Sequence, residues 1–365
     1  MIKQSVSVLG IGTAVPRYSM NQEKAAEMIR SFSWDSAELD RWMPLIHQKS
    51  SVQQRSLVFL EEEGQALKPA KIFSPMKDSE DQGPSTEERM SIYKKEAAIL
   101  AHEASRQAIC EANIGLENIH HLVTVSCTGF SAPGFDITLI QELGLSRAVS
   151  RTHIGFMGCH GVFNGLRVAH ALALADKKGS VLLSAVELCS IHLAYGSDPG
   201  DMVANALFSD GASSAILSAQ PSKKSGWRLA AMGSYLFPNS EHLMRWEIGN
   251  HGFRMHLSPE IPKTIEVNLK DVLTDWLKKS NLTISNIRSW AVHPGGPRIL
   301  GAVESALQLP ADALEVSKQI LSQYGNMSSA TILYIVDRLM EEQYETPCLA
   351  LGFGPGLHLE MALFI

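Results

Sequence analysis

The segment from Val162 to Ala175 is apolar on nearly every side. Its apolar positions are Val162, Phe163, Leu166, Val168, Ala169, Ala171, Leu172 and Leu174. A surface helix has a broad polar face, which this segment lacks. The pattern therefore predicts a buried helix, which requires other elements to pack around it.

The four residues Gly158-Cys159-His160-Gly161 come directly before this helix. Free N–H groups and the helix dipole at an N-terminus favour the thiolate form of a cysteine, so Cys159 is a candidate nucleophile. A single cysteine in an apolar run is more often a small core residue. A nucleophile also needs a base and an orienting group, and this segment alone leaves both interpretations open.

Composition restricts the partners and the location of the protein. The 365 residues are 45% hydrophobic, which suffices for a large core in roughly two domains or halves. The net charge of -6 comes without any basic block, which argues against a nucleic-acid partner. No run reaches the about 18–20 apolar residues of a membrane span, and the polar start of the chain does not match a secretion signal. We therefore expect a cytoplasmic protein without a membrane span.

The cysteine content indicates a reducing environment. The five cysteines are Cys110, Cys127, Cys159, Cys189 and Cys348. Their odd number, their wide spacing and the lack of a C-x-x-C pair predict neither a disulfide framework nor a zinc site. No metal is expected.

Predicted strands and helices alternate along both halves of the chain. Ser180 to Glu187, for example, is a nearly continuous apolar strand of the kind that is buried on both faces. The polar segment Gln220 to Gly226 is the best candidate for a boundary, giving halves of residues 1–220 and 226–365. This alternation predicts mixed α/β layers built twice from a similar plan.

The N-terminal region is less regular. Val6 to Leu9 is predicted as a strand and Gly10 to Pro16 as a turn, whereas residues 33–90 are predicted as mixed helix and loop. A glycine pair after a strand also occurs in dinucleotide-binding motifs. The third glycine of that motif is missing, so no dinucleotide is expected.

Three polar residues are predicted where a strand or a tight loop meets a helix: Cys159, His293 and Asn326. A buried cysteine beside an imidazole can act as a nucleophile at neutral pH, and an amide can donate a hydrogen bond to an oxygen that gains negative charge. Each residue also has a structural explanation. His293 fits a plain strand end, and Asn326 fits a helix cap. Their spacing does not prove that they converge.

Four motifs together resemble the type III polyketide synthases, the chalcone and stilbene synthase family. They are Gly158-Cys159-His160-Gly161, Trp290-Ala291-Val292-His293-Pro294-Gly295-Gly296-Pro297, Tyr324-Gly325-Asn326-Met327-Ser328-Ser329-Ala330 and Gly352-Phe353-Gly354-Pro355-Gly356-Leu357. The resemblance implies a thiolase-like fold with αβαβα layers, a homodimer and no bound cofactor, with coenzyme A thioesters as substrates. It implies that Cys159 takes an acyl group from a starter. His293 and Asn326 would then stabilise the enolate that malonyl-CoA forms on decarboxylation.

The resemblance also implies a substrate cavity. Phe208 matches an aromatic gatekeeper, and Met255 falls on a second gatekeeper position. Cys127 and Thr128 match cavity-lining positions, and Ser328, Gly354 and Pro355 are also assigned to the cavity. His160 and Val162 depart from the usual residues after the nucleophile, and Ala132 replaces a residue that reaches across the dimer in plant enzymes.

Cations for the coenzyme A phosphates are only partly retained. Lys49 matches one position of the plant pattern. Arg41 and Arg55 are substitutes near two positions that are apolar here, and Arg298 is a further candidate. Solvated surface positions explain these residues equally well.

Two other functions remain open. One is a single condensation, as in ketoacyl synthase III, and the other is a non-catalytic thiolase-fold protein that binds acyl-CoA. The expected product is a pyrone or a phenolic ring. The starter, the number of extensions and the ring closure depend on cavity shape, which the sequence does not give.

Overall fold

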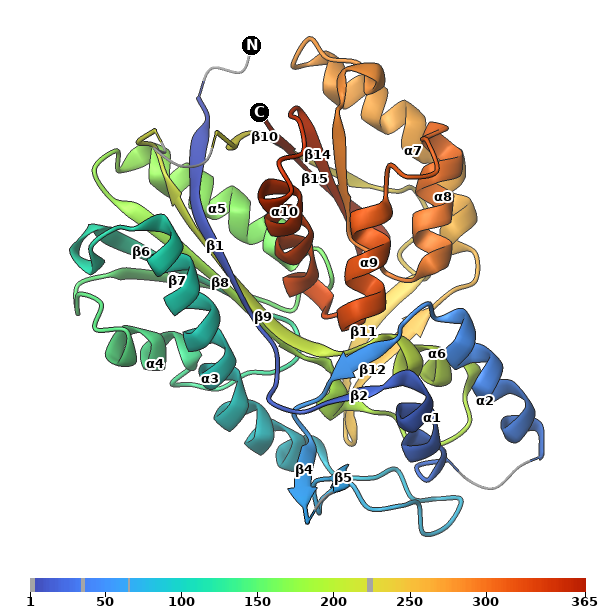
Figure 1. The fold of residues 1–365 in the computed structure, drawn as a ribbon. Coiled ribbons are helices and arrows are strands. Elements are labelled where there is room, and N and C mark those ends of the chain that lie inside the picture. Colours follow the sequence, from blue (N-terminus) through green and yellow to red (C-terminus); the bar gives the residue numbers. More distant parts are fainter. Residues whose placement is uncertain (1–3, 34–36, 65, 222–225) are drawn as a thin grey trace.

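The computed structural model describes residues 4–33, 37–64, 66–221 and 226–365. Within them the largest sheet has nine strands, and helices lie on its outer faces and between its halves (Figure 1). The strand order is β13 (Ser289–Val292), β14 (Cys348–Gly354), β15 (His358–Phe364), β10 (Arg228–Leu236), β1 (Val6–Ala14), β9 (Asp210–Ser218), β8 (Ser180–Leu188), β6 (Ile119–Ser126) and β7 (Ser150–Gly155).

The two halves of the sheet repeat one plan. The order β6-β8-β9-β1 in the first half corresponds to β13-β14-β15-β10 in the second. In both, the first pair is parallel and the next two pairs are antiparallel. Strands β1 and β10 pair antiparallel and join the halves. This confirms the predicted repetition, for which the sequence alone shows no clear internal repeat.

Helices α5 (Gly161–Ala175) and α10 (Thr331–Glu341) form the central layer between the halves (Figure 1). Residues alternate along β8 between two buried faces: Val181 and Leu183 pack on the central layer, and Leu182 packs on the outer side. The outer layers are α3 (Thr86–Ala112) with α4 (Phe135–Glu142), and α7 (Ile261–Lys278) with α8 (Pro297–Leu307). This is the expected αβαβα arrangement.

The predicted turn at Gly10 to Pro16 is wrong over most of its length, because β1 continues to Ala14. The two glycines let the strand approach α3 closely. A Cβ on Gly10 would lie 2.5 Å from the Ala112 nitrogen, and one on Gly12 would lie 2.3 Å from the Ala104 oxygen. The glycines therefore allow close packing and do not mark a turn.

Smaller elements cover the end of the sheet where the three candidate residues lie. They are α1 (Gln22–Arg30), α2 (Ala37–Lys49), α6 (Pro199–Leu207), α9 (Glu315–Tyr324) and three short pairs of strands: β2 (Ser19–Asn21) with β3 (Gln54–Ser56), β4 (Leu60–Glu63) with β5 (Ala66–Pro69), and β11 (Met244–Gly249) with β12 (Gly252–Leu257). The predicted boundary joins β9 to β10, and its residues 222–225 lie outside the described residues. No helix in the described parts of the chain is long and apolar enough to cross a membrane.

Candidate active site

Cys159 lies in a tight turn just before α5, and it is buried. The Gly161 N–H donates to the Gly158 carbonyl at 2.9 Å and closes this turn. Gly158 has a φ of +81, and a Cβ there would lie 2.3 Å from Pro355 Cδ. Glycine is therefore required at this position. Gly354 and Pro355 pack behind the nucleophile turn and fix its place.

Asn326 and Ser328 converge on the sulfur of Cys159. The Asn326 backbone pairs with the segment around Phe208, and its Oδ1 accepts a hydrogen bond from the Ser328 N–H at 2.9 Å. The Ser328 hydroxyl donates to Cys159 Sγ at 3.7 Å. The side chains of Ser328 and Asn326 both lower the pKa of Cys159. The Asn326 amide oxygen thus accepts a hydrogen bond within its own turn, and the Asn326 side chain also hydrogen-bonds the Cys159 sulfur.

His293 follows the last residue of β13 and is almost fully buried. Its N–H donates to the Leu351 carbonyl at 2.8 Å, which continues the pairing of β13 with β14. Among the residues that the structure describes, neither ring nitrogen has a hydrogen-bond partner. Burial, assisted by the nearby His160, lowers the pKa of His293 to about 3. The imidazole is therefore neutral at pH 7, and both nitrogens are free for a ligand.

The start of α5 does not hold Cys159 as a thiolate. Burial raises the pKa of its thiol to about 12, and Glu187 adds to this shift. The hydrogen bonds from Ser328, from Asn326 and from the backbone of Cys159 itself oppose the shift but do not overcome it. Burial thus outweighs the helix-terminus effect expected from the sequence, and the resting site contains a neutral thiol and a neutral imidazole.

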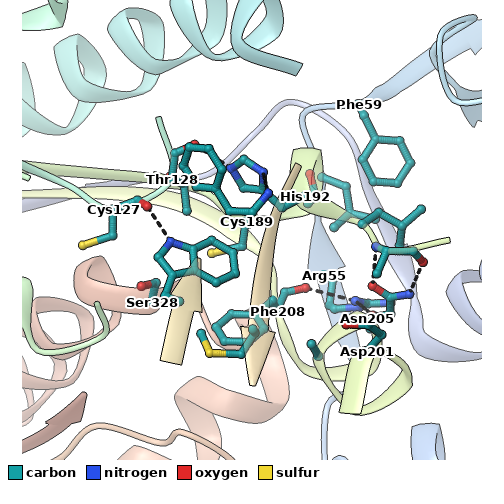
Figure 2. Close-up of a pocket in the computed structure, with 18 of the residues that line it drawn as sticks. Arg55, Phe59, Cys127, Thr128, Cys189, His192, Asp201, Asn205, Phe208 and Ser328 are labelled. Atoms are coloured by element: carbon teal, nitrogen blue, oxygen red, sulfur yellow. Dashed lines mark hydrogen bonds between the residues drawn. The ribbon is translucent and has the colours of Figure 1, made fainter. Parts of the chain in front are cut away.

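A cavity of about 50 Å³ lies next to this site (Figure 2). Gly158 and Ser328, which flank Cys159, form one side of it. Of the expected cavity residues, Cys127, Thr128, Phe208, Met255 and Ser328 line it, whereas Gly354 and Pro355 do not. The cavity is therefore assembled from both halves of the chain.

A buried carboxylate organises the cavity wall. Glu187, in β8, accepts hydrogen bonds from the Cys127 N–H at 3.0 Å, from the Thr128 hydroxyl at 2.8 Å and from the Ser329 hydroxyl. Burial raises the pKa of Glu187 to about 7. The sulfur of Cys127 in turn accepts from the Gly158 N–H at 2.9 Å, which ties the wall to the nucleophile turn. A carboxylate in a strand predicted to be buried on both faces is the sequence signal for this network.

The hairpin β11–β12 supplies cavity residues that sequence reasoning missed. Trp246 donates its indole N–H to the Cys127 carbonyl at 2.8 Å (Figure 2). Phe253 stacks on His192, with ring centroids 4.1 Å apart. His192 accepts from the Phe253 N–H and hydrogen-bonds the Thr128 carbonyl at 2.7 Å, so it joins the hairpin to the wall. Polar and apolar residues alternate along this short hairpin, a pattern that gives little sign of its role.

The expected phosphate contacts divide into two groups. Lys49, Arg41 and Arg298 are exposed. Arg55 is 2% exposed and donates to the carbonyls of Asn205 at 2.5 Å and Phe208 at 3.0 Å (Figure 2). A phosphate contact of Arg55 at the surface does not fit this burial. Arg55 instead fixes the backbone that carries the gatekeeper position.

The chain is similar to known proteins over nearly its whole length. The model of the N-terminal domain of chalcone and stilbene synthases matches residues 2–221, and that of the C-terminal domain matches residues 229–365. The chain is 29% identical to the alpha-pyrone synthesis polyketide synthase-like Pks18 of Mycobacterium tuberculosis, covering 97% of this chain and 90% of that protein. It is 30% identical to 1,3,6,8-tetrahydroxynaphthalene synthase of Streptomyces peucetius, covering 100% and 94%. The crystal structure of PKS-I from the brown alga Ectocarpus siliculosus aligns with a TM-score of 0.90 at 28% identity, covering 99% and 98% of the two chains.

Proposed function

The chain belongs to the chalcone and stilbene synthase family of type III polyketide synthases, and we propose that Cys159, His293 and Asn326 carry out its decarboxylative condensation of coenzyme A thioesters. One observation carries this assignment. The side chains of Ser328 and Asn326 act on a buried Cys159 sulfur, and within the described residues neither nitrogen of the buried His293 imidazole has a partner. A dry site with free donors is suited to stabilising developing negative charge.

Loading begins with attack of the Cys159 sulfur on the carbonyl carbon of an acyl-CoA. The thiol proton passes to His293 and then to the coenzyme A sulfur, whose bond to the acyl carbon breaks. Burial disfavours both the thiolate and the imidazolium. The proton therefore moves during the attack, when the incoming carbonyl and the sulfur are in contact.

Extension begins with loss of carbon dioxide from malonyl-CoA. The electron pair of the broken carbon–carbon bond forms an enolate, whose oxygen accepts hydrogen bonds from a neutral His293 N–H and from the Asn326 amide. The enolate carbon attacks the Cys159 thioester, and the sulfur of Cys159 leaves. The product is a β-ketoacyl-CoA that is two carbons longer and can load again.

The cavity supports a small product such as a pyrone. Its volume of about 50 Å³ is well below the ~300–1,000 Å³ of typical ligand pockets. The aromatic rings of Phe208, Trp246 and Phe253 take up the space around it. We infer a short starter and few extensions.

Trapping of the acyl-enzyme tests the proposed function. Incubation with a panel of acyl-CoA starters, without malonyl-CoA, is expected to add one acyl mass to the intact protein, located on Cys159. No adduct from any starter contradicts the proposal and favours a non-catalytic acyl-CoA-binding protein. With malonyl-CoA added, products extended by a single two-carbon unit would indicate the ketoacyl synthase III-like reaction.

Replacing Trp246 with glycine is expected to lengthen the product by at least one two-carbon unit, because it removes an indole ring from the cavity. The cost in stability is expected to be below the about 3–5 kcal/mol of aromatic-to-small changes in a core, because Trp246 is only partly buried. Trp246→Phe is the matched control: it loses the hydrogen bond to Cys127 but keeps most of the volume. Unchanged product masses in Trp246→Gly would contradict control of chain length by this residue.

The substrates, the absence of a cofactor, the oligomeric state and the location are proposed from membership of the family. Coenzyme A thioesters are the substrates of its members, and we propose that this chain uses an acyl-CoA starter and malonyl-CoA without a bound cofactor. A homodimer in the cytoplasm is also proposed. Analytical ultracentrifugation at micromolar concentration measures the oligomeric state directly.

A further inference from the structure

A seam of polar side chains runs between α5 and β15, behind the nucleophile turn. His160, Asn164 and Arg167 are spaced four and three residues apart, so they share one face at the start of α5. His358 and Glu360 are two apart on β15 and share a face of the sheet. The Asn164 amide donates to Glu360 at 3.2 Å, and Arg167 forms an ion pair with Glu360. These five residues are called the α5–β15 seam.

The seam has a buried end and an accessible end. His160 is 3% exposed, and neither of its ring nitrogens has a hydrogen-bond partner in the described part of the chain. Its ring lies 5.3 Å from that of His358, in an edge-on arrangement. The His358 side chain is 26% exposed, and its Nδ1 is 3.7 Å from Glu360 Oε1. Two imidazoles thus lead from the interior toward solvent.

The buried end of the seam meets the active site. His160 directly follows Cys159, and a Cβ on Gly354 would lie 2.4 Å from its ring. Gly354 pairs with His358 across β14 and β15, and the Leu351 carbonyl earlier on β14 accepts from the His293 N–H. Charge on His160 also lowers the pKa of His293. His160 therefore contacts the His358 ring and lies close enough to His293 to act on it electrostatically.

The proposed reaction consumes a proton that the site cannot regenerate. In the first loading, the proton of the resting site leaves with coenzyme A as its free thiol. Condensation then releases the Cys159 sulfur as a thiolate, without a proton. In the next loading, the coenzyme A thiolate that leaves again needs a proton. Acyl-CoA, malonyl-CoA and one proton give β-ketoacyl-CoA, carbon dioxide and coenzyme A, so each extension requires one proton from outside.

We propose that His358 and His160 carry this proton from solvent to His293. The inference rests on the proposed function and adds a route that serves it. Two rings 5.3 Å apart can exchange a proton directly after a small rotation or through one water molecule. Burial lowers the pKa of His160 to about 4. Of the charged and titratable groups that face it, His358 adds to this shift and Glu360 opposes it. Burial also lowers the pKa of His358, Glu360 opposes this shift, and Arg167, across the seam, adds to it. A protonated His160 is therefore short-lived, as transfer requires.

Two variants and a control test the route. His160→Phe keeps an aromatic ring but cannot carry a proton. His358→Gln keeps a polar side chain at the accessible end but likewise cannot carry a proton. His170→Phe removes another imidazole from α5, outside the seam. Two rates are measured: the single-turnover first loading of Cys159, by intact-protein mass, and steady-state extension with malonyl-CoA. Extension is also followed in heavy water and as a function of pH.

The first loading uses the resident proton, so it is expected to be unchanged in both seam variants. Extension is expected to fall by about 10-fold or more, with a larger solvent isotope effect and a steeper loss as pH rises. His170→Phe is expected to behave like the wild type. Wild-type extension rates in both variants would overturn the proposal, as would an equal loss in loading and extension, which indicates a role in shaping the site. If His160→Phe does not fold, His358→Gln alone decides. Failure of the wild type to load would instead overturn the proposed function.

Discussion

Replacement of Cys159 with alanine is expected to abolish polyketide formation, with a loss on the order of 10³-fold or more in kcat. The variant has no sulfur that can accept the acyl group. Cys127, the nearby alternative, has its sulfur hydrogen-bonded to the Gly158 backbone. Cys348→Ala is the matched control, because it removes another buried thiol, from β14. Product formation at the wild-type rate in Cys159→Ala would exclude the mechanism.

Cys159→Gln separates loading from decarboxylation. The variant cannot form a thioester, but its amide occupies the place of the sulfur and leaves His293 and Asn326 as donors. Carbon dioxide release from malonyl-CoA is therefore expected to continue without any extended product. Complete loss of carbon dioxide release, in a variant that remains folded, would contradict the division of roles.

The layers of the fold follow from periodicity, but their details do not. The strand Ser180 to Glu187 and the apolar helix after Cys159 are both found as predicted, because burial on both faces leaves a continuous apolar run. The end of β1 was predicted incorrectly, since Gly10 and Gly12 are required by contact with α3, which lies about a hundred residues away in sequence. Local patterns contain no information on such contacts.

The site was predictable to the extent that its chemistry is local. Glycine-flanked motifs indicate Cys159 and Asn326, and the fold brings Asn326 and Ser328 to the sulfur. Charge and position made Arg55 a candidate for the coenzyme A phosphates or for the solvated surface, yet its guanidinium binds two backbone carbonyls in the interior. Trp246 was missed because its importance arises from hairpin pairing and from a hydrogen bond to a distant strand end.

Replacement of His293 with glutamine is expected to slow the loading of Cys159 by about 10²–10⁴-fold, the usual contribution of a general base. Glutamine donates a hydrogen bond but cannot take the thiol proton. Loading then depends on the small fraction of thiolate. Because burial raises the pKa of Cys159 to about 12, that fraction grows about tenfold per pH unit at any pH below this value. The residual rate is therefore expected to rise steeply from pH 6 to 9, whereas the wild-type rate varies less.

Single-turnover loading, measured as acyl-enzyme mass against time at each pH, checks this expectation. Asn326→Ala is the informative comparison, because Asn326 is proposed to serve the enolate and its amide, although it acts on the Cys159 sulfur, cannot take the thiol proton. It is expected to retain the wild-type pH profile for loading while decarboxylation falls by about 10²–10³-fold, the usual effect of removing one oxyanion donor. A flat pH profile in His293→Gln would mean that the thiol is deprotonated without the imidazole. Burial would then not set the resting state of the sulfur, and the site would operate from a preformed thiolate.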